Sequence, residues 1–189
     1  MSRRIREPRI DVDCRGLVDS HGPHKPVRIC LHDTESHDVK GIGDLAGIAR
    51  FWQAQGRGYG AQIGVDAEGH SARYVNDTLI AWHVGGINTG TLGVEQIGFA
   101  RWGKAVWVAR PRQLEKVARW LAYWHVEYGI PLKRARFDEA TGLMGPGVFT
   151  HKDWSDVSAL SDHWDPGYGY PTTFVIWRAR QLVRQGGWS

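Results

Sequence analysis

The chain has 189 residues and a mass of 21.3 kDa, a length that fits one domain. Hydrophobic residues make up 42% and charged residues 23%, with 24 glycines and 8 prolines, which excludes a disordered, collagen-like or coiled-coil chain. The net charge of +4 and the pI of about 9.2 favour acidic partners, but only weakly. The ten tryptophans, twice the number of phenylalanines, are unusual and need a structural explanation.

No segment of the sequence has the features of an export signal or a membrane anchor. The basic start, MSRRIREPRI, has no apolar run behind it, and no stretch of about 18 apolar residues occurs. We therefore expect no signal peptide, no membrane insertion, a cytoplasmic location and a monomer. Cys14 and Cys30 are the only cysteines, too few for a disulfide framework, and a bridge between them is the less favoured alternative.

The first half of the sequence predicts a lead-in, a helix and several short strands. Residues 1–26 contain three prolines and little periodicity, so we expect an irregular N-terminal lead-in before a domain over residues 27–189. Residues 27–32 form a short β-type run. Residues 44–55 place apolar side chains at i, i+3, i+4 and i+7, which is typical of a helix that Gly56 ends.

The next segments alternate in the way strands do. Residues 59–65 alternate apolar side chains with Gly and Gln, and the DAEG turn at 66–69 leads into a second strand over 70–75. Short β-like segments follow at 79–83 and 92–99.

The second half begins with the clearest helix, from Pro111 to Tyr128, which has one apolar stripe and ends at Gly129. Four further segments follow: an exposed loop or short helical insert over 132–146, a strand over 147–151, a polar loop over 152–171 and a helix over 173–185. Strands that return between helices predict an α/β fold, with a single mixed central β-sheet flanked by helices.

Three side chains could supply metal-ion chemistry. His32 and His151 come at the carboxyl ends of predicted strands, and Asp165 lies in the loop SDHWDPG. Two neutral imidazoles and a carboxylate are a set that catalytic zinc uses, with a fourth position open for water. The bound ion lowers the pKa of that water to about 7. The spacing alone is no compact motif, and surface histidines would give the same pattern.

Five short segments, in this order, strengthen the hypothesis: ICLHDT at 29–34; GYGAQI at 58–63 with DAEG; AWHVG at 81–85 with Asn88 and LGVE at 92–95; FTHKD at 149–153; and DPG at 165–167. Together they resemble the type 2 N-acetylmuramoyl-L-alanine amidase family, which includes phage endolysins and animal peptidoglycan-recognition proteins. The resemblance covers roughly residues 27–185 and implies the fold of that family.

The resemblance also implies an activity and its cofactor. The family cleaves the amide between the lactyl group of N-acetylmuramic acid and L-alanine, so the implied substrate is peptidoglycan or a muropeptide. One Zn²⁺ per chain would be held by His32, His151 and Asp165. His163 stands where many members carry a Lys that stabilises the oxyanion, and it is also the rival of Asp165 as third ligand.

Further residues take roles from the same resemblance. Tyr59 matches the active-site tyrosine, and Glu95 matches a residue that is a general base in some members and structural in others. Five residues are expected to contact substrate: Thr34, His83, Asn88, Trp154 and Trp164.

For Cys30 and for a group of four cations, a purely structural role is favoured over a functional one. A Cys30 thiolate could ligate zinc, but ligands at i and i+2 of one strand diverge, so we favour a small buried side chain. Four cations, Arg110, Arg112, Lys116 and Arg119, follow helical spacing and predict a solvated helix face, with attraction to an anionic wall as the alternative.

Three functions remain in competition. The resemblance favours a zinc amidase of phage-endolysin type, which would stay in the host cytoplasm until it is released to the wall. The alternatives are a non-catalytic peptidoglycan-recognition module and a cytoplasmic amidase that recycles muropeptides. Non-catalytic members commonly lack the third ligand, whereas Asp165 is present here. No nucleic-acid partner is expected, because no basic–aromatic strand motif occurs.

Overall fold

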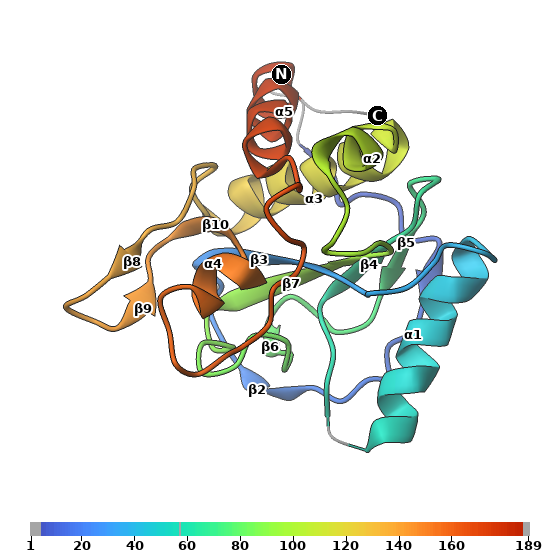
Figure 1. Cartoon of the computed structure of the whole chain (residues 1–189), viewed down its shortest axis with the longest axis horizontal. Coiled ribbons are helices and arrows are strands. Elements are labelled where there is room, and N and C mark those ends of the chain that lie inside the picture. The colour runs from blue at the N-terminus through green and yellow to red at the C-terminus, as the bar shows by residue number, and fades with distance from the viewer. Residues whose placement is uncertain (1–4, 57, 187–189) are drawn as a thin grey trace.

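The computed structural model describes residues 5–56 and 58–186, and its centre is a six-stranded sheet (Figure 1). The strand order is β1-β5-β4-β7-β3-β10, and every neighbouring pair is parallel except β4 and β5. The bounds are β1 Val12–Asp13, β3 Arg28–Asp33, β4 Ile63–Val65, β5 Ser71–Arg73, β7 Thr91–Gln96 and β10 Gly147–Thr150. The expected mixed sheet in an α/β fold is confirmed.

Helices cover both faces of this sheet (Figure 1). On one face lie α2 (Lys104–Val108), α3 (Pro111–Tyr128) and α5 (Thr172–Arg184), whose apolar side chains share one core with the sheet. Helix α1 (Ile42–Gln55) packs through a separate cluster against residues around β5. In the described part of the chain, no helix combines the length and apolar character needed to cross a bilayer.

The two faces of the sheet differ because side chains alternate along each strand. In β3, Ile29 and Leu31 point into the core under α3 and α5, whereas Cys30 belongs to a cluster on the opposite face. His32 follows the same alternation as Cys30. The strand pattern therefore separates an apolar face from a face that carries polar side chains.

The longer predicted elements are confirmed, and the shortest ones were missed. The expected helices over 44–55, 111–128 and 173–185 correspond to α1, α3 and α5. Residues 132–146 are neither loop nor helix, but contain a hairpin of β8 (Phe137–Asp138) and β9 (Leu143–Met144). The polar loop contains a short helix, α4 (His151–Ser155), and α2 was not expected.

The N-terminal lead-in is part of the fold rather than irregular. Its residues 12–13 form β1, the edge strand beside β5, and β2 (His21–Pro23) pairs with β6 (Leu79–Ile80). Cys14 lies in the core beneath α1. Both cysteines are buried free thiols, so they do not form the disulfide bridge that was the less favoured alternative.

Candidate metal centre

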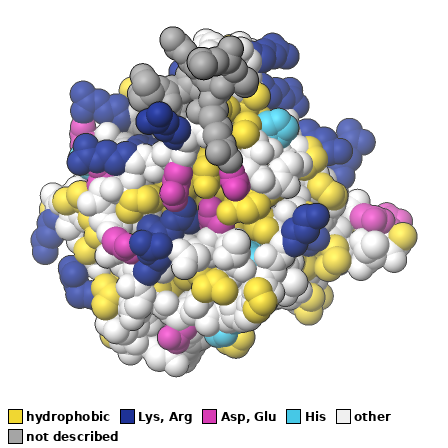
Figure 2. Space-filling model, turned by 180° about the vertical axis from the view of Figure 1, so that it is seen from behind, with side chains coloured by type: hydrophobic (Ala, Val, Ile, Leu, Met, Phe, Trp, Pro, Cys, Tyr) yellow, Lys and Arg dark blue, Asp and Glu magenta, His cyan; other side chains and the backbone are white. Residues whose placement is uncertain are grey.

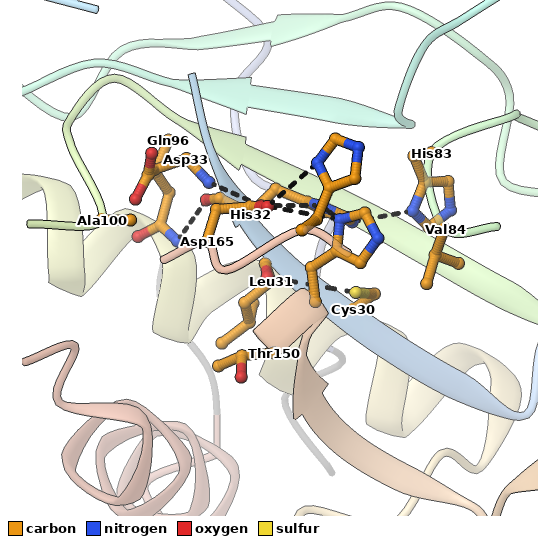
Figure 3. Close-up of polar contacts among 12 residues, drawn as sticks. Cys30, Leu31, His32, Asp33, His83, Val84, Gln96, Ala100, Thr150 and Asp165 are labelled. Carbon is orange, nitrogen blue, oxygen red and sulfur yellow. Dashed lines mark hydrogen bonds and ion pairs between the residues drawn. The ribbon is translucent and has the colours of Figure 1, made fainter. Parts of the chain in front are cut away.

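Two histidines and a carboxylate meet where β3 and β10 end. In the parallel register Thr150 lies opposite Leu31, so His151, the first residue of α4, comes beside His32. The loop after α4 brings Asp165 to the same place (Figure 3). His32 Nδ1 lies 3.1 Å from both Asp165 Oδ2 and His151 Nδ1, and His151 Nδ1 lies 3.4 Å from Asp165 Oδ1.

These distances between the donor atoms suit a small cation with tetrahedral coordination. Nitrogen and oxygen ligands at about 2.0–2.1 Å from zinc lie roughly 3.3 Å from one another. The three donor atoms face each other at that spacing, and their side chains are nearly buried. Three inward-facing donors of this chemistry fit a divalent transition metal.

The charges of the cluster also suit a cation. Burial alone would raise the pKa of Asp165, but hydrogen bonds from His151, His163 and His32 outweigh it and hold that pKa far below its usual value. Burial lowers the pKa of His151 to about 4. Asp165 is therefore a carboxylate and His151 a neutral imidazole at neutral pH, which are the protonation states that bind metal.

A second layer of hydrogen bonds orients both imidazoles. His32 Nε2 lies 2.9 Å from His83 Nδ1, and His151 Nε2 lies 2.9 Å from Ser161 Oγ. If the Nδ1 atoms offer lone pairs to an ion, each Nε2 carries a proton and donates it outward. His83 Nδ1 is then the acceptor, and His83 Nε2 donates to the Thr91 carbonyl at 3.4 Å.

A second group of donors overlaps the first. The donor atoms of Cys30, His32 and His83 also lie within 4.8 Å of one another, so the expectation that Cys30 and His32 diverge is wrong. Cys30 is fully buried, and burial raises the pKa of its thiol well above the usual value. Because zinc binds the thiolate, this set is the poorer one for a metal.

Glu95 lies next to His32 in the sheet. The two residues are register partners in β7 and β3, so their side chains share one face at strand spacing. Burial, and then the charges of Asp165 and Asp33, raise the pKa of Glu95 well above its usual value. Glu95 Oε2 is buried and has no hydrogen-bond partner in the described part of the chain. These surroundings favour the protonated form of the Glu95 carboxyl group when no cation is near.

His163 lies at the exposed rim of the cluster. The His163 ring stacks on His151 with centroids 4.4 Å apart, and its Nδ1 lies 3.5 Å from Asp165 Oδ1. That hydrogen bond raises the pKa of His163. His163 is mostly exposed and contacts the outer side of the cluster, so Asp165 has the better geometry for a third ligand. Tyr59 is 44% exposed, and its backbone forms an isolated parallel β-bridge with that of Trp82.

Three of the expected substrate contacts make hydrogen bonds within the protein; burial contradicts the prediction for Trp154, while those for Asn88 and His83 stay predictions. Trp154 is buried, and its Nε1 donates to the Gly85 carbonyl, so it cannot line a groove. Asn88 Oδ1 accepts from the backbone N–H groups of His83 and Val84. His83 itself supports His32, as described above.

The other two expected contacts differ in exposure. Thr34 is half-buried, and its hydroxyl group interacts with Ser36 Oγ at 2.7 Å. Trp164 is 52% exposed and remains available to a ligand.

Two further contacts, one at the cluster and one at Trp82, were not predicted from the sequence. Ser161 precedes His163 by two residues, but no pattern marks it as the partner of His151. His21, in the supposed lead-in, stacks on Trp82 with ring centroids 3.9 Å apart. Both contacts depend on tertiary structure, since they join segments that lie apart in the sequence.

Comparison with known proteins identifies the family to which the chain belongs. The sequence profile of the Amidase_2 family, described as N-acetylmuramoyl-L-alanine amidase, matches residues 22–168. A search of curated proteins gave no match.

Solved structures show the same fold at low sequence identity. The Staphylococcus aureus hydrolase AmiA, in complex with its ligand, is similar at a TM-score of 0.70 and 18% identity, covering 96% of this chain and 87% of that one. The endolysin amidase LysCS from Clostridium intestinale reaches 0.57 at 14% identity, with coverages of 95% and 99%. The peptidoglycan recognition proteins LCa and LCx, bound to tracheal cytotoxin, give 0.59 at 15%, with 86% and 94%. With its profile match over most of its length, the chain belongs to the N-acetylmuramoyl-L-alanine amidase family.

Proposed function

We propose that this protein is a zinc-dependent amidase that hydrolyses the bond between the lactyl group of N-acetylmuramic acid and L-alanine in peptidoglycan, acting on the cell wall as endolysins do. The observation that carries the proposal is the convergence of His32, His151 and Asp165, with donor atoms 3.1–3.4 Å apart, in a chain of this family. These three residues would hold one Zn²⁺, and the fourth position would face the exposed rim.

The ion, when bound, would polarise the scissile carbonyl and make hydroxide available at neutral pH. Glu95, with Tyr59 as the alternative, would act as the general base; its buried Oε2 atom has no hydrogen-bond partner among the described residues, which supports this role. In this role Glu95 would take a proton from the attacking water and pass it to the leaving amine of L-alanine.

The rim residues would orient the substrate. His163, whose pKa is raised by Asp165, can carry positive charge and donate a hydrogen bond to the developing oxyanion. Tyr59 can orient the scissile carbonyl through its phenol. The exposed faces of Trp164 and Trp82 can pack on sugar rings and apolar stem residues.

The decisive experiment identifies the bond that is cut. Purified cell walls and a soluble muropeptide are incubated with the protein, with and without a chelator, and the products are analysed. We expect new N-terminal alanine, loss of activity on chelation and recovery with Zn²⁺. New reducing sugar ends would contradict the amidase assignment.

The same assay separates the alternatives. A recycling amidase would cut the soluble muropeptide and leave intact walls turbid. A recognition module would bind either substrate and release nothing. The presence of Asp165 beside both histidines supports the catalytic alternative over the last one.

A further inference from the structure

Three of the four cations at the start of and along α3, expected to form a solvated helix face, lie beside a carboxylate. Arg112 pairs with Glu68, Arg119 with Glu115 at 3.1 Å, and Lys116 lies 3.7 Å from Asp11. The Arg110 guanidinium lies over the Trp102 ring. Three cations of this surface are therefore tied into ion pairs, in which Glu115 also binds Arg178 and Asp11 also binds Arg9.

A different surface keeps its charge. Two adjoining open surface depressions, of about 400 Å³ and about 490 Å³, lie between α5, the end of α3 and the β8–β9 hairpin, and Lys133 lines both. We call them together the basic cleft. Its cations are Lys133, Arg134, Arg136, Arg180 and Arg184. No Asp or Glu is among the described residues that line it.

Most of these cations lack a carboxylate partner. Among the described residues, only Arg134 of the five makes an ion pair, with Asp153 at 2.6 Å. The Arg180 Nε donates to the Leu132 carbonyl at 2.7 Å, which fixes the direction of its guanidinium group. In Figure 2 the β8–β9 hairpin projects at the right, and Lys and Arg side chains gather on the surface above it.

The floor of the basic cleft is fixed to the central sheet. The Ala135 N–H donates to the Val148 carbonyl, and the Val148 N–H donates to the Lys133 carbonyl, so residues 133–135 run along β10. Gly147 makes this approach possible: its φ is 141°, and a Cβ there would lie 2.7 Å from Lys133 O. The backbone that carries Lys133 and Arg134 is therefore held in place by the sheet.

We propose that the basic cleft binds a phosphodiester polymer of the bacterial cell wall, as a second binding site beside the amidase centre. Guanidinium groups match phosphate oxygens in pairs, and a row of cations over two depressions suits a chain of repeating phosphates better than a single ion. The choice of a wall polymer rests on the family, whose substrate lies in the wall.

Both sites can be occupied at the same time. The strand β10 begins at the basic cleft with Gly147 and leads to His151 at the metal centre. Four residue steps at roughly 3.3 Å separate the two by about 13 Å. A polymer held in the cleft would keep the enzyme on the wall without entering the catalytic centre.

The test measures binding and hydrolysis separately. Binding of polyglycerol phosphate at low ionic strength is measured by calorimetry for the wild type and for Arg136→Glu/Arg184→Glu. We expect an affinity loss of about tenfold or more and a shallower salt dependence for the double variant. Turnover of a soluble muropeptide stays unchanged, so a failure of this proposal is distinct from a failure of the amidase assignment.

A matched control changes the net charge by the same amount elsewhere. Arg50→Glu/Lys104→Glu alters two exposed cations that do not line the cleft, and we expect its affinity to stay within about twofold. The milder Arg136→Gln/Arg184→Gln should give an intermediate loss. Equal losses in the cleft and control variants, no binding by the wild type, or tighter binding of duplex DNA than of the polymer would each overturn the proposal.

Discussion

Two buried clusters on opposite faces of the sheet differ in what burial does for them. Under α3 and α5 the buried side chains are apolar, and Trp107, Trp120 and Trp124 are fully enclosed. On the other face, beside the smaller apolar cluster of Cys30, lie the buried imidazoles and carboxylates around His32. Burial of apolar surface stabilises the fold, whereas burial of polar donors costs free energy unless they are paired. The first cluster therefore holds the molecule together, and the second is positioned by it.

Removing Asp165 should show the largest functional effect. Asp165→Asn retains the shape of the side chain but removes the charge that two histidine Nδ1 atoms face. We expect metal affinity to fall at least about a hundredfold, because outer hydrogen-bond partners alone contribute roughly 10–100-fold. Metal content and amide hydrolysis are measured on protein whose circular dichroism matches the wild type. Full metal retention would show that His163, not Asp165, completes the site.

Removing Trp124 should have the opposite signature. Trp124→Ala opens a cavity in the apolar cluster and takes away the Nε1 donor that lies 2.8 Å from Asp77 Oδ2. We expect a loss of about 3–5 kcal/mol in the free energy of unfolding, measured by urea denaturation. The control Trp177→Ala changes a half-exposed ring and should stay within about 0.5 kcal/mol. If the folded fraction of Trp124→Ala failed to bind metal, the apolar cluster would also determine metal binding, and the two clusters would not differ in role.

His83 tests whether the polar cluster extends beyond the three candidate ligands. His83→Ala removes the acceptor for His32 Nε2, so we expect metal affinity to fall by about 10–100-fold. His83→Gln retains an acceptor oxygen and should lose less. Competition with a chromophoric chelator measures both affinities. Equal losses for the two variants would mean that His83 acts by packing alone.

Trp164 should give the smallest effect, confined to the substrate. Because the ring is half exposed, Trp164→Ala should change the free energy of unfolding by no more than about 0.5 kcal/mol. We expect binding to purified walls to weaken several-fold, measured in a pull-down assay. By contrast, Trp154→Ala should behave like Trp124→Ala, since Trp154 is enclosed. Unchanged wall binding by Trp164→Ala would remove that residue from the substrate surface.

The fold was predictable where a period repeats often enough to be seen. Helix α3 runs for 18 residues, so its apolar stripe recurs over five turns. The strands β1, β8 and β9 have two residues each, and α2 and α4 have five, too few to show a period. Such short elements exist because their neighbours hold them, and a single sequence does not contain that information.

In the candidate site, the direction of side chains at strand ends could be predicted, whereas that of side chains in loops could not. Strand ends aim side chains in a known direction, so the meeting of His32 with His151 could be inferred, although their role as ligands stays a prediction. Loops carry no such periodicity. Trp154 and Trp164 therefore looked alike in the sequence, yet one is enclosed and the other is half exposed. The contact of His83 with His32 joins segments 51 residues apart, and that of Ser161 with His151 spans a loop without periodicity, so neither had a sequence signal.

The edge strand β1 has a consequence for exchanging this domain between proteins. The family profile begins at residue 22, after β1 has already paired with β5. A chimera joined at that boundary would leave the backbone groups of β5 open along one side, which is a template for aggregation. It would also lose Cys14 and Val18 from the cluster beneath α1. The unit that can be transplanted is therefore longer than the unit that similarity recognises, and residues 5–21 should travel with it.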